Sequence, residues 1–483
     1  MEERNNRRKL FLIVSLFAIF YSLISLVNHY CFRTYALDLG LYTNALYDYA
    51  HLQWNDSSVF KKFNENLLAD HFDFYLIAFS PFSYLFGTYT LLILQIFFVL
   101  LGGVGVNKVV YLYTSNSRIA LWATVYFYCF FGVIAPLSYD YHSNVVAATL
   151  LPWFLYFFHQ RKILKSALVF LAILLGKENM ALWMIFVCLG LMINYKEDTQ
   201  ARKFLLYHAA FALLYFILVI FVVMPKLSNQ AIYVHFDYDC LGQDFSSAIL
   251  FLISHPIDAL QLLFVNHSGN PDADYVKLEA YILLLITGIY LLFLKPQYLL
   301  MLLPIFLQKM YHNNMQMWSV ITHYCIEFAP VLAIGISCVL HEMKVQKTKN
   351  IFIAFVLLGC IVASFRVMDN TLISNDRERL KVYVPNHYRR NYDIQKVHEE
   401  INKIPHDAVI SAQSPFLAHL ALRDKIYQFP ILKDADFIVY SFDEQPYPLS
   451  KDEFKKLTDD LIVNGNWTIQ FKRASFVVLK RSR

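Results

Sequence analysis

The residues of this chain that could do chemistry form four short motifs at the ends of long apolar runs. They are Asp38, Asp70-His71, Asp140-Tyr141-His142 and Lys177-Glu178. A carboxylate can take a proton from a hydroxyl, and a lysine or a histidine can bind the oxygens of a phosphate group. Because an unpaired charge beside a bilayer is costly, we interpret these motifs as parts of one polar functional site.

Two of the carboxylates also have a purely structural explanation. Asp38 could begin an interfacial helix that runs through Tyr47, where an acid at the N-cap or in the first turn is stabilising. Asp70 could cap the apolar segment that follows it, which leaves His71 as a candidate contact to an anionic ligand. The sequence favours capping for Asp70 and leaves Asp38 open between a cap and a catalytic base.

Other candidates depend on partners elsewhere in the chain. Lys177 and Glu178 are adjacent opposite charges, which near a membrane surface most commonly form a self-neutralising pair. Residues at i and i+1 do not face each other on a helix, however, so each is expected to find a different partner. Lys177 is the candidate for binding a phosphate. His323 begins a later apolar run and would share a helical face with Glu327. We expect either a substrate contact or a buried hydrogen-bonded pair there.

One spacing predicts a metal site. Asp140 and His142 could ligate a divalent cation such as Mg²⁺ or Mn²⁺ together with another loop, and they could also cap the span that follows. The seven cysteines show no Cys-x-x-Cys or Cys/His ligand spacing. They therefore predict neither a disulfide framework nor a zinc site.

The elements that must position these residues are membrane helices. Of the 483 residues, 57% are hydrophobic and only 16% are charged, whereas about a quarter of a soluble domain is charged. This composition predicts a polytopic, all-α membrane protein. The basic residues lie in short clusters beside apolar runs, which is the positive-inside pattern and argues against nucleic-acid binding.

The basic clusters also set the expected topology. The apolar stretch from Leu10 to about Val27 is long enough for an uncleaved first span with a cytoplasmic N-terminus. If the later apolar runs cross the membrane in alternating directions, with the basic clusters inside, the chain has about eleven transmembrane helices and its C-terminal domain lies outside. The short segment Phe72 to Phe86, broken by Pro81, is expected to be re-entrant or interfacial, because counting it as a span would put the basic clusters outside.

The chain is expected to have two domains. Residues 1–370 form the transmembrane domain, with outer loops at 31–71, 138–142 and 226–278. Residues 385–483 have the composition of a small, soluble, extracytoplasmic α/β domain.

Two stretches within these domains have recognisable patterns. The long outer loop contains an amphipathic stretch, Phe245 to Phe264, which predicts an interfacial helix interrupted once at Pro256. The C-terminal domain should contain helices near residues 391–403 and 451–463 and a closing pair of strands.

Taken together, the motifs resemble a predicted bacterial membrane-protein family that is catalogued as a domain of unknown function. The family's topology is similar to that of GT-C glycosyltransferases, which use polyprenyl-phosphate sugars. The similar segments cover nearly the whole chain, namely Asp38-Leu39-Gly40, 68–72, 140–142, 177–178, 323–324, 404–405, 411–413, 419–420, Arg423 and 426–430. The resemblance implies a GT-C-like fold in the bacterial inner membrane.

The resemblance also implies roles for single residues. In GT-C enzymes an acidic residue of the first outer loop acts on the acceptor or on a metal, and Asp38 matches it by place. Asp140 matches the acid of the second outer loop. Two features depart from the pattern: the first loop lacks the His-Pro-Pro run of some relatives, and the second loop has Asp-x-His where metal-dependent members often have Asp-x-Asp.

The function implied is transfer of a sugar from a polyprenyl-phosphate donor to an acceptor at the periplasmic face. Asp38 and Asp140 are the expected catalytic residues, and the expected substrate contacts are His71, His142, Lys177, Glu178 and His323. The alternative is a non-enzymatic lipid or polysaccharide transporter or an assembly scaffold. A transporter should show paired internal repeats, and the sequence has no clear repeat.

Overall fold

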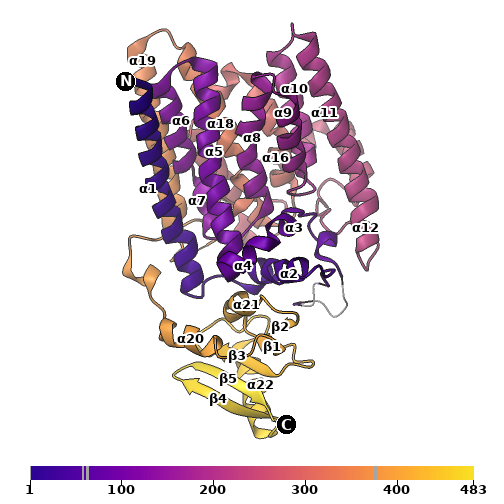
Figure 1. Cartoon of the computed structure of the whole chain (residues 1–483). Helices are drawn as coiled ribbons and strands as arrows, with labels where there is room; N and C mark the ends of the chain where they lie inside the picture. Colours follow the sequence, from indigo (N-terminus) through magenta and orange to yellow (C-terminus); the bar gives the residue numbers. More distant parts are fainter. Residues whose placement is uncertain (1, 57–58, 61–64, 375–377, 483) are drawn as a thin grey trace.

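The structure is a computed structural model that describes residues 2–56, 59–60, 65–374 and 378–482. Residues 57–58 and 61–64 of the predicted first outer loop therefore lie outside the described part. Figure 1 shows a bundle of helices with a small sheet domain beyond one end. The N-terminus lies at the far end of the bundle from this domain, as the predicted topology requires (Figure 1).

The bundle is built from apolar helices that run back and forth between its two ends. In its middle, α5 (Thr90–Thr114) packs between α6 and α8, and α10 packs between α11 and α16. The helices of the bundle are α1 (Glu2–Tyr30), α5, α6 (Ser117–Cys129), α7 (Phe131–Leu137), α8 (Ser143–His159), α9 (Ile163–Leu174), α10 (Met180–Asn194), α11 (Thr199–Leu218), α15 (Val276–Ile286), α16 (Pro296–Tyr311), α18 (Phe328–Glu342) and α19 (Gln346–Asp369).

Fewer of these helices are long enough to cross a membrane than the sequence suggested. Among the described residues, five helical stretches meet the length and hydropathy of a span, or up to seven if each of two bent pairs is one span. The helices α9 and α10 are apolar but have only 12 and 15 residues, whereas a span needs roughly 20. The structure confirms a polytopic helical membrane protein and does not confirm eleven spans.

The segment after the first outer loop is divided into short helices. The turns α3 (Tyr75–Phe79), η3 (Ser80–Phe82), α4 (Ser83–Phe86) and η4 (Gly87–Tyr89) precede α5, and Pro81 lies in η3. They pack against α2 (Leu41–Ala50), at the end of the bundle nearest the sheet domain (Figure 1). The long straight part of this apolar stretch is therefore α5 alone.

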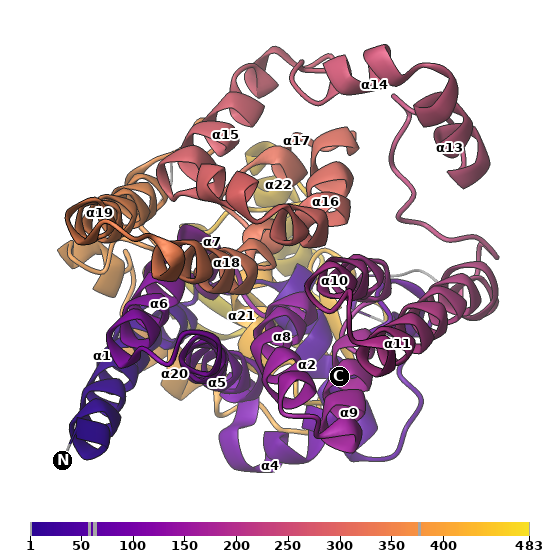
Figure 2. The same cartoon turned by 90° about the horizontal axis from the view of Figure 1, so that it is seen from above.

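The long outer loop makes an arm at the rim of the bundle. It begins after α12 (Met224–Leu227) and contains α13 (Phe245–Ser254) and α14 (Pro256–Leu262), which are bent by 109° relative to each other. Proline at the start of α14 ends α13, as the sequence predicts. Seen from above, both helices lie apart from the central helices (Figure 2). The short helix α17 (Met315–Trp318) follows α16.

The C-terminal domain is a five-stranded sheet with three helices. The strand order is β2-β1-β3-β5-β4, in which β2, β1 and β3 are parallel and β3, β5 and β4 are antiparallel. The predicted helices and closing strand pair are present, while α21 and β2 were not foreseen. The elements are α20 (Ile394–Ile401), β1 (Ile410–Ala412), α21 (Ser414–Leu420), β2 (Ile426–Gln428), β3 (Phe437–Ser441), α22 (Lys451–Val463), β4 (Trp467–Arg473) and β5 (Phe476–Arg481).

Candidate active site

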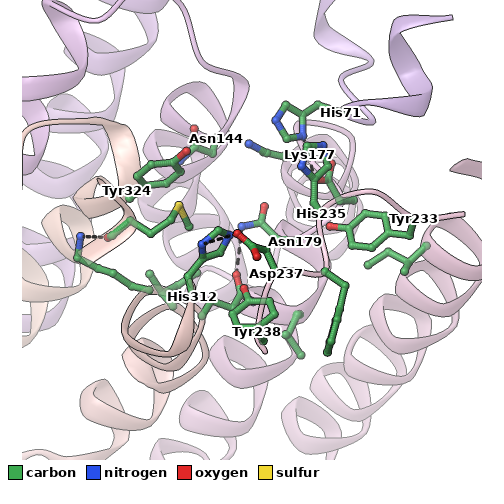
Figure 3. Close-up of a pocket in the computed structure, with 18 of the residues that line it drawn as sticks. His71, Asn144, Lys177, Asn179, Tyr233, His235, Asp237, Tyr238, His312 and Tyr324 are labelled. Carbon is green, nitrogen blue, oxygen red and sulfur yellow. Dashed lines mark hydrogen bonds and ion pairs between the residues drawn. The ribbon is translucent and has the colours of Figure 1, made fainter. Parts of the chain in front are cut away.

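A cavity of about 520 Å³ lies where the first outer loop, the α9–α10 turn and the long outer loop meet. It is lined by polar and aromatic side chains, ten of which are labelled in Figure 3. Lys177, His71 and His235 gather at one end, and Asp237, Tyr238 and His312 lie nearer the middle (Figure 3). The cavity therefore joins two of the sequence-predicted motifs to the long outer loop, in which the sequence analysis had named no site residue.

Lys177 is the cation of this cavity with no internal partner. It lies in the turn between α9 and α10, is half-buried and lines the cavity. Among the residues that the structure describes, its ammonium group makes no hydrogen bond or ion pair. A half-buried ammonium without a partner is costly unless water or an anion satisfies it, so this position suits an anionic ligand.

Glu178 turns away from Lys177 and holds the end of the first outer loop. Its Oε1 lies 3.1 Å from His71 Nδ1, and its Oε2 accepts a hydrogen bond from the Phe72 backbone at 3.1 Å. Burial alone would raise the pKa of Glu178, but His71 and Lys177 lower it below the usual value. Burial lowers the pKa of His71, and Lys177 lowers it further. Glu178 is thus an ionised support for a neutral His71.

Asp38 is not an N-cap, but it is an acid in the first turn of a helix, which is the other structural role that the sequence left open. It lies inside a π-helical turn, η1 (Ala36–Gly40), whose N-cap residue Tyr35 makes no side-chain cap. Burial raises the pKa of Asp38 to about 7, and the charge of Asp140 raises it while that of Lys177 lowers it. A carboxylate with this pKa is half-ionised near neutral pH, where it is a much better base than an ordinary aspartate.

Asp140 supports the turn that carries Asp38. Its Oδ2 accepts hydrogen bonds from the backbone of Tyr35 at 3.0 Å and, more loosely, of Leu39 at 3.5 Å. Gln95 fixes the Asp140 backbone by donating to its carbonyl at 2.9 Å. The pKa of Asp140 is raised to about 6 by burial, against the lowering effect of Arg379. Asp140 is therefore a positioning residue in this geometry.

The two histidines predicted as substrate contacts lie against each other. The rings of His142 and His323 stack with centroids 3.5 Å apart. His323 makes no hydrogen bond to Glu327, whose Oε1 instead accepts from Asn144 Nδ2 at 2.9 Å. The helical i, i+4 spacing fails here because His323 lies in a 3-10 turn and α18 starts only at Phe328. The predicted His323–Glu327 pair is thus replaced by an Asn144–Glu327 pair.

The capping role also falls to a different acid. Asp70 does not cap the apolar segment; its Oδ1 lies 3.2 Å from His235 Nε2. The N-terminal turn of α3 is instead held by Asp73, whose Oδ1 accepts from the Tyr75 backbone at 2.9 Å. The sequence alone gave no reason to prefer Asp73.

The C-terminal domain docks directly on the loop that carries Asp38. Ser414 Oγ accepts a hydrogen bond from the Ala36 backbone at 3.0 Å, and Asn44 Nδ2 donates to the carbonyl of Arg423 at 2.8 Å. Gly40 sits so close to α21 that an added Cβ would lie 2.5 Å from Leu417 Cδ2. The domain thus helps to fix the position of Asp38.

Two site residues were not predicted from the sequence. His235 comes from the long outer loop and stacks on His71 with ring centroids 4.3 Å apart. Arg379, beyond the last bundle helix, lies with its guanidinium carbon 4.5 Å from the centre of the Tyr35 ring and donates to the Ser138 carbonyl. Each is an isolated charged or ionisable residue in a loop, so only its position in the fold reveals its contacts.

Comparisons with known proteins agree with this architecture. A crystal structure of ArnT from Cupriavidus metallidurans bound to undecaprenyl phosphate is similar to the chain, with a TM-score of 0.53, 11% sequence identity and 97% of each chain covered. At this identity the similarity shows the fold alone, which is ArnT-like over nearly the whole chain. None of the curated proteins matches the sequence. The family model described as "Predicted membrane protein (DUF2079)" matches residues 28–478, and the chain therefore belongs to this family.

Proposed function

We propose that this protein is an integral membrane glycosyltransferase of the GT-C type. It transfers a sugar from a polyprenyl-phosphate donor to an acceptor at the periplasmic face of the bacterial inner membrane. The observation that carries the proposal is the ammonium of Lys177, which lines the cavity and has no partner among the residues that the structure describes. Its positive charge also lowers the pKa of Asp38. The structurally similar ArnT was crystallised with undecaprenyl phosphate, which supports the choice of lipid.

The donor phosphate is assigned to the Lys177 end of the cavity. Lys177 offers three N–H donors. The neighbouring His71 donates its Nδ1–H to Glu178, so it could donate to the phosphate from Nε2 only when the ring is protonated. The exposed apolar residues of α13 and α14, such as Ile253 and Ile257, provide a surface for the lipid chain at the rim. These features support a phosphate bound in the cavity and a prenyl chain directed toward the bilayer.

The chemical step uses Asp38 as the base. Its carboxylate takes the proton of the acceptor hydroxyl while that oxygen attacks the anomeric carbon of the donor sugar. The bond between this carbon and the phosphate oxygen breaks, and the phosphate leaves with the electron pair. Lys177 stabilises the charge that develops on the leaving phosphate. Because a phosphate is a good leaving group, a strong general acid is not required.

Binding of the lipid phosphate tests the proposal. Purified protein in detergent is titrated with undecaprenyl phosphate, and Lys177→Ala should bind it about ten- to a hundredfold more weakly, since losing a hydrogen bond to a charged group costs roughly 1.5 to 3 kcal/mol. Lys162→Ala removes an exposed lysine at the start of α9 and should bind normally. Unchanged affinity in a folded Lys177→Ala protein would refute the assignment of the phosphate.

A further inference from the structure

Three possible metal ligands meet beside Lys177. Asp70, His71 and His235 each offer one ligand atom, and these atoms lie within 4.8 Å of one another. The first two residues end the first outer loop, and His235 comes from the long outer loop. All three are half-buried, and both histidines line the cavity, so an ion can reach them from solvent.

The contacts already have the arrangement that a metal site needs. His235 Nε2 lies 2.7 Å from the Asp70 carbonyl oxygen and 3.2 Å from Asp70 Oδ1. Glu178 Oε1, 3.1 Å from His71 Nδ1, fixes the ring of His71 and leaves Nε2 for a ligand. A carboxylate behind a histidine is the usual second layer of a metal site, where it orients the ring and makes the ligating nitrogen more basic.

The local charge also favours a cation. Asp70 and Glu178 are two carboxylates at this end of the cavity, and Lys177 is the single ammonium beside them. The two carboxylates would attract a divalent ion, and the bound ion would add positive charge beside Lys177.

We propose that Asp70, His71 and His235 bind a zinc-class transition-metal ion, which fastens the long outer loop onto the first outer loop. Two imidazoles and one carboxylate suit Zn²⁺, whereas Mg²⁺ prefers oxygen ligands alone. Three protein ligands leave a fourth position open to water or to an anion. The ion takes the place of the proton that joins His235 to Asp70. This site differs from the Asp140–His142 pair predicted from the sequence, and it stands whether or not the protein is a transferase.

Zinc binding to the untagged, full-length protein tests the site. After chelation and buffer exchange, calorimetric titration with ZnCl₂ should show one ion per chain. His235→Gln keeps a donor for the Asp70 carbonyl but is a poor zinc ligand, and we expect its affinity to fall at least about a hundredfold. Glu178→Gln should lose roughly ten- to a hundredfold, the range for an outer-layer partner. His255→Ala, in the exposed turn between α13 and α14, should bind as the wild type does.

A second measurement tests whether the ion fastens the long outer loop, and it does not detect the ion itself. Chymotrypsin can cut the long outer loop at Tyr233, Phe236 and Tyr238, and saturating Zn²⁺ should slow this cleavage about tenfold in the wild type and not in His235→Gln. Stoichiometric zinc binding that survives in His235→Gln, or the absence of stoichiometric binding to the wild type, would overturn the proposal. Neither measurement uses a sugar donor, so failure here and failure of the transferase proposal are distinguishable.

Discussion

The two ends of the candidate site are held in different ways. The Asp38 turn is fixed from two sides, by Asp140 on the backbone of Tyr35 and by Ser414 of the C-terminal domain on the backbone of Ala36. At the other end, Lys177 has no partner among the described residues, and the long outer loop forms one wall of the cavity that it lines.

This difference suggests that the two ends have different tasks, namely positioning the base and binding the anion. A base must be held in place before the acceptor arrives, because a small misplacement of the reacting groups is costly in rate. An anion site does not need a fixed internal partner, because the bound anion itself accepts hydrogen bonds from the N–H donors of Lys177. The base end should therefore act on the rate of transfer alone, whereas the cation end should act on the affinity for the lipid and, through the leaving phosphate, on the rate as well.

The largest effect is expected at the base. Asp38→Asn keeps the size of the side chain and removes its ability to take a proton, so the transfer rate should fall by about a hundredfold or more. Folding should be unaffected, because Asp38 caps no helix. Turnover is measured with a lipid-linked sugar donor at equal protein concentration and equal melting temperature.

The matched control for Asp38→Asn is Asp459→Asn, which changes an exposed acid on α22. It should leave turnover and affinity unchanged. Near-normal turnover in a folded Asp38→Asn protein would remove Asp38 from the mechanism and end the contrast between the two regions.

The elements were easier to predict than the contacts between them. Hydropathy alone predicted the membrane helices, and the break at Pro256 and the helix at 451–463 followed from local rules. The predicted number of spans is not confirmed, because apolar runs such as α9 and α10 are shorter than a bilayer crossing. Local patterns do not report whether an apolar helix crosses the membrane or is buried among other helices.

The candidate site was predictable in its residue types and not in its pairings. Asp38 and Lys177 stand out as charges beside apolar runs. The contacts around these two residues join segments that lie far apart in the sequence. Asp140 binds the backbone of Tyr35 in the turn that carries Asp38, and His235 stacks on His71 beside Lys177. The π-helical turn around Asp38 was missed for the same reason, since tertiary hydrogen bonds to Asp140 and Ser414 hold it.

A smaller effect is expected for a substitution that disturbs the Asp38 turn and leaves the Lys177 end unchanged. Ser414→Ala removes the acceptor for the Ala36 backbone and leaves a buried donor unsatisfied, which costs about 1 to 3 kcal/mol. The melting temperature should fall and turnover should drop severalfold, while affinity for undecaprenyl phosphate stays unchanged. Ser246→Ala, an exposed position on α13, is the control. An equal loss of lipid affinity in Ser414→Ala would show that the two ends are not independent.

The smallest effect concerns pH. Asp38 must be ionised to accept a proton, and its pKa is raised to about 7, so turnover should rise with pH and reach half its maximum near pH 7. Asp140→Asn keeps an acceptor oxygen for Tyr35 but removes the like charge, which lowers the pKa of Asp38 and moves this rise to lower pH. A pH profile that is flat between pH 5.5 and 8.5 would contradict the assignment.

The most direct test of the account is transfer by the purified protein in liposomes. Polyprenyl-phosphate sugars and acceptors extracted from native membranes are supplied, and mass spectrometry follows the lipids. The wild type should convert the lipid-linked sugar into free polyprenyl phosphate and a glycosylated acceptor, and Asp38→Asn should bind the donor without consuming it. Binding followed by movement of the intact donor across the bilayer, with no product from the wild type, would contradict the transferase proposal and identify a transporter.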